Sequence, residues 1–193
     1  MIKGNNVMNI KKIILVFSFI VIFSSLAASE LGKDITLYLQ QRGIPKSLIV
    51  ILISTLPIVE LRGAIPVAIG LLGMSWWESL IYAIIGNLLP IPFVLLFMER
   101  FTLLLNKWSF TKKLLAKIFA RTRNKSKVIE RYEEIGLTLF VAIPLPITGA
   151  WTGSLAAYIF GLKFWKSLLC ALAGVTIAGF VVTIISTTAF SFF

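Results

Sequence analysis

Two breaks inside apolar sequence constrain this chain more than any other feature. The first break reads LPIVELRGAIP (residues 56–66) and the second reads IPLPITGAWTG (residues 143–153); we call them the first tip and the second tip. Proline and glycine interrupt helices. Lipid does not tolerate exposed irregular backbone, so a break at membrane depth must lie against protein or a wet cavity. The breaks therefore predict interrupted helices that meet inside a bundle.

The composition indicates that lipid is the solvent around those breaks. Of the 193 residues, 58% are hydrophobic and 14% are charged, whereas a soluble domain carries about a quarter charged residues. Two uninterrupted apolar segments, residues 80–105 and 168–193, are long enough to cross a bilayer, which takes roughly 20 residues. We expect an all-α integral membrane protein.

The segments beside the tips are too short to span a bilayer individually. They pair as residues 47–59 with 63–77, and as residues 136–147 with 149–160. Our interpretation is that each pair forms a re-entrant helical hairpin, which enters the membrane and returns to its own side. The alternative, one long kinked helix that crosses the membrane for each pair, stays open.

An internal repeat supports the hairpin interpretation. GMSWWESLIYAIIG (residues 73–86) and GLKFWKSLLCALAG (residues 161–174) share six identities at a constant offset of 88 residues. The repeat unit is one hairpin plus one transmembrane helix, which crosses the membrane an odd number of times. Two tandem copies must then have opposite orientation, and we expect an inverted-topology repeat.

The predicted domain organisation follows from this repeat and from the charges. We expect a signal peptide or signal anchor over residues 1–28, because a basic front, an apolar core and a small-residue tail follow one another there. Residues 29–193 form a single membrane domain. Within it, repeat one covers about residues 45–106, a basic cytoplasmic loop covers residues 107–135, and repeat two covers about residues 136–193.

The charge distribution predicts the orientation. The net charge is +11, and nine of the nineteen basic residues lie between Lys107 and Arg131. Cytoplasmic loops of membrane proteins are rich in lysine and arginine, which explains the charge without a nucleic-acid partner. We expect a cytoplasmic N-terminus, if it is uncleaved, and a C-terminus outside.

The first tip holds the two charges of its apolar surroundings, Glu60 and Arg62. Charges at membrane depth are costly and mark ion or substrate paths. We expect Glu60 to be a protonatable coupling group and Arg62 to bind an anionic substrate group, with Gly63 and Pro66 in the same site. Pro66 is expected to open the second half-helix. The alternative is a structural ion pair.

The second tip offers uncharged polar groups. Thr148 and Thr152 supply hydroxyls, Pro144 and Pro146 free nearby carbonyls, and amides follow Gly149 at the start of the next helix. The N-terminus of a helix is a positive dipole end that suits anions. The alternative for these residues is close packing between membrane helices.

Asn87, in the first transmembrane segment, is expected to need a partner inside the bundle. Packing is its expected role, and cavity lining is the alternative.

An enzyme is not expected. The chain has no histidine, and Glu60 is the only carboxylate at depth, so neither a nucleophile with its base nor an acidic metal cluster is evident. We expect no cofactor and no metal site. The chain has no P-loop motif, so the sequence gives no indication that ATP is the energy source.

The two tips also resemble a known family. ELRGAIPVAIG (residues 60–70) and PLPITGAWTGS (residues 144–154), each followed by a tryptophan-containing transmembrane segment, resemble the bacterial putative small multidrug export proteins, over roughly residues 45–193. That family is similar to DedA-type proteins in its paired re-entrant loops. DedA-type proteins are implicated in moving lipid-linked phosphates and in scrambling lipids.

The resemblance implies a multi-pass protein of the bacterial plasma (inner) membrane. It also implies that Glu60 matches the acidic residue of the first DedA loop. The arginines of the second DedA loop have no counterpart in residues 144–153.

We expect a proton-coupled secondary transporter or flippase. It would move an amphiphilic or anionic substrate, such as a lipid phosphate, through a cavity at the two tips. The alternative is a lipid scramblase or a membrane-protein scaffold without coupled transport. Expected partners are membrane lipids, a small amphiphilic or lipid-linked substrate and protons, and association into a homo-oligomer stays open.

Overall fold

The computed structural model describes residues 30–105, 127–144 and 148–191, and every regular element in these ranges is an α-helix. A first helix includes residues 30–41. The helices that follow are α2 (Lys46–Ser54), α3 (Glu60–Gly70), α4 (Trp76–Leu88), α5 (Ile91–Leu105), α7 (Lys127–Ala142), α8 (Ala150–Ile159) and α9 (Phe164–Ser191). The all-α prediction is confirmed for these residues. The predicted signal segment and most of the predicted basic loop lie outside them.

Within the described ranges, two helical stretches are long and apolar enough to cross a membrane, as the sequence predicted. Trp76–Met98, which runs through α4 into α5, has 23 residues, and Phe164–Ser191, the whole of α9, has 28. Large apolar side chains on these stretches are more than half exposed, among them Phe93, Trp165 and Ile184. An apolar surface of this extent suits contact with lipid.

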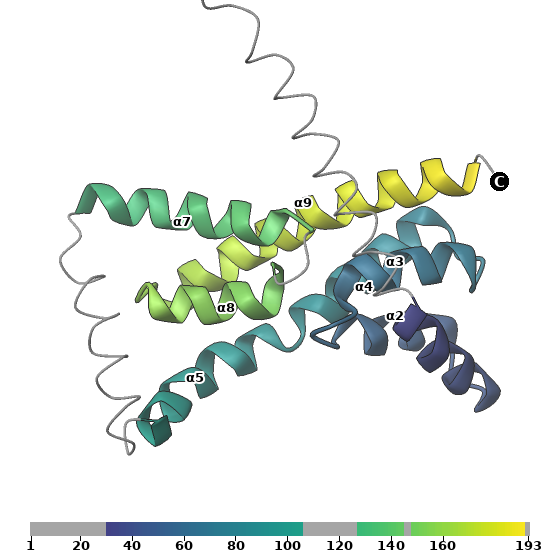
Figure 1. Ribbon diagram of the computed structural model, residues 1–193, viewed down its shortest axis with the longest axis horizontal. Helices are drawn as coiled ribbons and strands as arrows, with labels where there is room; N and C mark the ends of the chain where they lie inside the picture. The colour runs from purple at the N-terminus through teal and green to yellow at the C-terminus, as the bar shows by residue number, and fades with distance from the viewer. Residues whose placement is uncertain (1–29, 106–126, 145–147, 192–193) are drawn as a thin grey trace, which may run out of the picture.

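Helix α9 packs against most of the other labelled helices (Figure 1). It contacts α7 and α8, which lie side by side, and it also contacts α3 and α4. Helix α2 packs against α3 and α4, while α5 packs against α8. The structure therefore brings the helices beside both tips together along α9.

Glycines let the helices approach closely at corresponding places in the two halves. A Cβ at Gly86 in α4 would overlap the backbone of Ile51 in α2. A Cβ at Gly174 in α9 would lie 2.8 Å from the carbonyl oxygen of Thr138 in α7. Small residues at helix contacts are typical of membrane bundles, because they let backbones pack against one another.

The turns before α4 and α9 have the same local structure. Gly73 and Gly161 adopt φ values of 61° and 73°, a region that glycine enters at low cost. Each of these helices begins three residues after its glycine. Ser79 and Ser167 then donate to the carbonyl oxygen four residues earlier, at 2.9 and 3.1 Å. The sequence repeat thus corresponds to repeated local structure.

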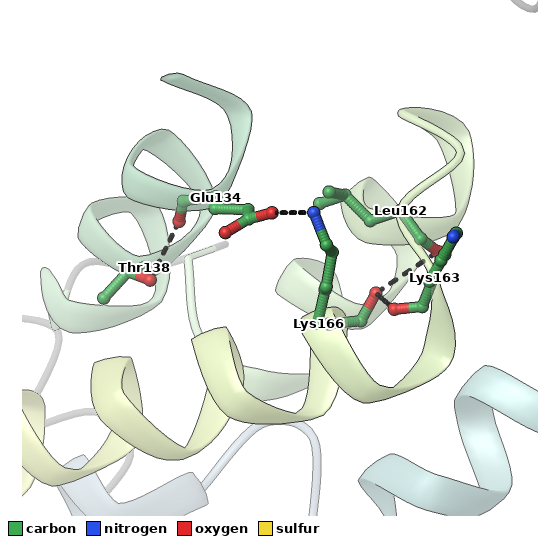
Figure 2. A network of polar contacts seen from close by, with 6 residues as sticks. Glu134, Thr138, Leu162, Lys163 and Lys166 are labelled. Carbon is green, nitrogen blue, oxygen red and sulfur yellow. Dashed lines mark hydrogen bonds and ion pairs between the residues drawn. The ribbon is translucent and has the colours of Figure 1, made fainter. Parts of the chain in front are cut away.

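A polar network joins α7 to the first turns of α9 (Figure 2). Lys166 Nζ lies 2.5 Å from Glu134 Oε1, and Thr138 Oγ1 donates to the Glu134 carbonyl oxygen at 2.9 Å. Both charged side chains are at least a third exposed, so the ion pair contributes little stability. It links the middle of α7 to the first turn of α9.

The first break is shorter than predicted. Helix α2 ends at Ser54 and α3 already begins at Glu60, so Gly63 and Pro66 lie inside α3. The prediction that Pro66 opens this helix is wrong. A proline inside a helix removes one backbone hydrogen bond, and membrane bundles accept that loss where neighbouring groups satisfy the freed carbonyl.

The start of α7 also differs from the sequence pattern. The helix begins at Lys127, well before the apolar segment that was predicted to begin at residue 136. Its first turns are rich in charged residues, so a search for apolar stretches does not find them.

Candidate functional site

Glu60 has an unusual backbone conformation at the start of α3. Its φ is 46°, and no other described residue except glycine has a positive φ. This left-handed region is uncommon for a residue with a Cβ. Its side chain is only 5% exposed. Strain of this kind persists only where the surrounding structure holds it, so the fold keeps a carboxylate buried at this position.

The carboxylate of Glu60 lies directly against the second tip. A Cβ at Gly149 would overlap both of its oxygens, and Gly149 itself has a φ of 150°. The backbone N–H of Trp151, in the first turn of α8, donates to the carboxylate. A negative group at a helix N-terminus satisfies free amides and meets the positive end of the helix dipole. Glu60 of the first tip therefore caps the helix that leaves the second tip.

Arg62 supplies the positive charge of this site. It is 8% exposed, and its Nη2 donates to the carbonyl oxygen of Ile58 at 3.3 Å. Its guanidinium attracts the Glu60 carboxylate. Burial disfavours an ionised carboxylate, while a nearby guanidinium and donated hydrogen bonds favour it, so the protonation of Glu60 depends on these neighbours.

Trp151 makes a second link between the two halves. Its indole Nε1 donates to the carbonyl oxygen of Thr55, the C-cap of α2, at 3.1 Å. One residue of α8 therefore bonds both to the end of α2 and to the start of α3. The sequence analysis did not single out Trp151. An indole N–H beside a helix break, which needs a partner when buried, was the available signal.

A small cavity lies between the two tips, and we call it the tip cavity. About 10 Å³ of it is open to the centre of a water-sized sphere, which is room for about one water molecule. Its lining residues come from both tips and from three transmembrane or hairpin helices: Glu60, Leu61, Arg62, Asn87, Val141, Pro144, Thr148, Gly149, Ala150, Val175 and Ala178.

The structure thus brings five of the predicted site residues to one place. Glu60, Arg62, Pro144, Thr148 and Gly149 all line the tip cavity. The Thr148 hydroxyl donates to the Ile143 carbonyl oxygen at 2.6 Å.

The other predicted site residues lie elsewhere. Gly63 is buried in α3, where its carbonyl faces Gly32 of the first helix. Pro66 is also inside α3, away from the cavity lining. The Thr152 hydroxyl lies 3.4 Å from the Gly149 carbonyl oxygen. Pro146 lies outside the described residues.

Asn87 reaches the same cavity from α4. It is 1% exposed, and its Oδ1 accepts no hydrogen bond from the part of the chain that the structure describes. None of the described residues therefore supplies the hydrogen-bond donor that this oxygen was expected to have. Cavity lining, the alternative role, is what the structure shows.

A larger apolar groove runs between α5 and α8, beside the second tip. We call it the α5–α8 groove; it measures about 480 Å³ and is lined by Phe93, Val94, Phe97, Met98, Trp151, Thr152 and Leu155. Ligand pockets for small molecules fall in this size range. The Trp151 and Thr152 side chains belong to the groove, while the Trp151 amide binds Glu60. The groove and the tip cavity are therefore neighbours along α8, where Ala150 lines the cavity and Trp151 lines the groove.

Comparison with known proteins identifies a family. A family model described as "Putative small multi-drug export protein" matches residues 60–181, which is more than half of the chain and includes Glu60, Asn87 and the second tip. Curated proteins and solved structures give no match.

Proposed function

Since this chain belongs to the putative small multi-drug export protein family, we propose that it is a membrane exporter driven by protons through Glu60. The family name itself suggests membrane export and a transporter rather than an enzyme. The proposed additions are the coupling ion, the residue that carries it and the class of substrate.

The observation that carries this proposal is the contact between Glu60 and the second tip. The carboxylate accepts a hydrogen bond from the Trp151 amide and lies against Gly149. When a proton binds Glu60, its charge disappears, and both its attraction to Arg62 and its interaction with the α8 N-terminus weaken. Protonation would therefore loosen the junction of the two halves, as alternating access requires.

The same junction supports an anionic amphiphile as substrate. The groups that hold the Glu60 carboxylate, Arg62 and the N-terminus of α8, are suited to any anion. When Glu60 is protonated, a phosphate or carboxylate head group would bind Arg62 and the N-terminus of α8 in its place. The neighbouring α5–α8 groove offers apolar and aromatic side chains for the rest of the molecule. A lipid phosphate has both parts.

We also propose that the two halves form the inverted repeat with re-entrant hairpins. The matching glycine turns, serine hydrogen bonds and close glycine contacts support two equivalent units. The lysine- and arginine-rich loop that joins the two units supports a cytoplasmic location for that loop. The chain would then cross the plasma membrane several times with its C-terminus outside. The relation to DedA-type proteins stays a prediction.

Reconstitution tests this function. The chain is placed in proteoliposomes with a phosphorylated lipid or a cationic dye, with and without a proton gradient. We expect gradient-driven movement of the phosphorylated lipid. It should fall about tenfold or more in Glu60→Gln, because glutamine cannot take up and release the proton and also loses the charge-assisted hydrogen bond to the Trp151 amide. Glu134→Gln, the same change at an exposed carboxylate, is the matched control. Gradient-driven export that survives Glu60→Gln would refute the coupling role.

A lipid scramblase is the second candidate, and the α5–α8 groove favours it. The groove is apolar and its Phe93 and Phe97 side chains are more than half exposed, so lipid chains can enter it from the bilayer. Scrambling needs no gradient. Equal lipid movement in both directions, unchanged by Glu60→Gln, would support this candidate over the exporter.

A further inference from the structure

We propose that the tip cavity is a binding site for one water molecule, held between the Asn87 amide oxygen and the Glu60 carboxylate, and that this water is the immediate proton carrier for Glu60. The role in proton transfer rests on the proposed function, whereas the water site itself does not. Asn87 is not among the predicted site residues, and its role expected from the sequence is packing or cavity lining, with none in proton transfer.

Asn87 provides the first reason. A buried carbonyl oxygen normally accepts a hydrogen bond, and an exception indicates a bound water or ion. Asn87 Oδ1 is such an exception within the described ranges, and the residue is 1% exposed. The residue lines the cavity that Glu60 also lines. An isolated amide oxygen at this depth is costly, so a donor in the cavity would be strongly favoured.

Size and partners provide the second reason. A buried water needs about 10–15 Å³ of space open to its centre and two to four polar partners, and the tip cavity has about 10 Å³. The water's two hydrogens would go to Glu60 and Asn87. Thr148 and Arg62 are the other residues with polar side chains that line this cavity. The cavity therefore matches one water in both volume and hydrogen bonding.

The charges favour a water over a metal cation. Among the described residues that line the cavity, Glu60 and Arg62 are the charged ones, and their formal charges cancel. The N-terminus of α8 adds a positive dipole end beside Glu60. The remaining walls are largely apolar, including Leu61, Val141 and Val175. A sodium ion would leave this enclosed space with a net positive charge, which is costly.

The proton step is simple. A proton that reaches the site from the aqueous side arrives on this water as hydronium. It passes to a carboxylate oxygen of Glu60, which becomes neutral, and a neutral water stays behind. Release follows the reverse path. Asn87 is in this sense a positioning residue, since it holds the water but takes no proton.

Two substitutions of Asn87 separate this role from packing. Asn87→Leu keeps the branching of the side chain and removes its oxygen, while Asn87→Ser keeps an oxygen and enlarges the cavity. If Asn87 holds a water, proton-driven transport falls about tenfold or more in Asn87→Leu and stays near the wild-type rate in Asn87→Ser. The opposite order would show a packing role and would overturn the proposal.

A direct measurement of the water does not depend on transport. Infrared difference spectra of the full chain in nanodiscs are recorded between acidic and alkaline buffer, in ordinary water and in water labelled with oxygen-18. We expect a buried-water O–H band that shifts with the label, is lost in Glu60→Gln and Asn87→Leu, and persists in Asn87→Ser. A wild-type spectrum without such a band would overturn the water site.

Two further results complete the test. Replacement of sodium by choline in the buffer should change neither the infrared spectra nor the transport rate. A requirement for sodium would show that a cation, not a water, occupies the cavity. A labelled band without proton-driven transport would leave the water site standing and refute the proposed function. Since the wild-type spectrum needs no variant, the proposal stays testable even if Asn87→Leu does not fold.

Discussion

Replacing Gly149 by alanine tests the junction of the two tips most directly. The added Cβ would overlap both carboxylate oxygens of Glu60, and the backbone φ of 150° is one that residues with a side chain rarely adopt. The carboxylate cannot move away freely, because its own residue is 5% exposed. We therefore expect Gly149→Ala to strain the backbone and to break the cap of α8.

Both effects have a magnitude. Holding alanine in a sparsely populated backbone region costs roughly 1–3 kcal/mol. Displacing a buried charged acceptor from its donor costs about 1.5–3 kcal/mol. The free energy of unfolding should fall by about 2.5–6 kcal/mol. Gly161→Ala is the matched control, because its φ is 73° and nothing lies within 4 Å of the added Cβ; backbone strain alone costs about 1–2 kcal/mol.

The assay is reversible denaturation in mixed detergent micelles, repeated in a Glu60→Ala background. Without the carboxylate the overlap with Glu60 disappears, so Gly149→Ala should then cost only its backbone strain, about 1–3 kcal/mol. The double-mutant cycle should give a coupling energy of about 1.5–3 kcal/mol. An equal cost of Gly149→Ala with and without the Glu60 carboxylate would show that the two tips do not depend on this contact.

Four other predictions follow from single contacts. Trp151→Phe keeps the backbone amide but loses the indole hydrogen bond to the end of α2. The free energy of unfolding in the same assay should therefore fall by about 1 kcal/mol. Gly86→Ala and Gly174→Ala force apart helices that touch at the backbone, and each should destabilise the fold by about 1–3 kcal/mol. Glu134→Gln removes an exposed ion pair and should change the unfolding free energy by less than about 1 kcal/mol; a larger loss would show that this network does more than mark a helix contact. Phe97→Ala, at an exposed wall of the groove, should weaken binding of a fluorescent amphiphile about fivefold without affecting stability.

Much of the fold could be predicted from local patterns. Apolar length predicted the two long stretches, since a bilayer core sets the number of residues that cross it. Proline and glycine marked where the shorter helices are interrupted, although they did not give the boundaries: α3 begins at Glu60 and contains Pro66. Helix starts depend on backbone angles at single residues, and the left-handed φ of Glu60 is not a property that its residue type predicts.

The position of the candidate site at the first tip could also be predicted, because burying a carboxylate and a guanidinium in apolar surroundings is costly. Sequence alone therefore determined that this chain is helical and apolar, has two segments long enough to cross a membrane and carries a carboxylate and a guanidinium near a helix break. These properties depend on residues that are neighbours along the chain.

Only the tertiary structure decided which groups the pair meets. Glu60 binds the start of α8, some ninety residues later in the chain, and Asn87 reaches the same cavity from a third helix. Contacts of this kind depend on how whole helices pack against one another. No spacing or periodicity within one segment encodes them, because the partners share no local pattern and meet only when α3, α4 and α8 are brought together.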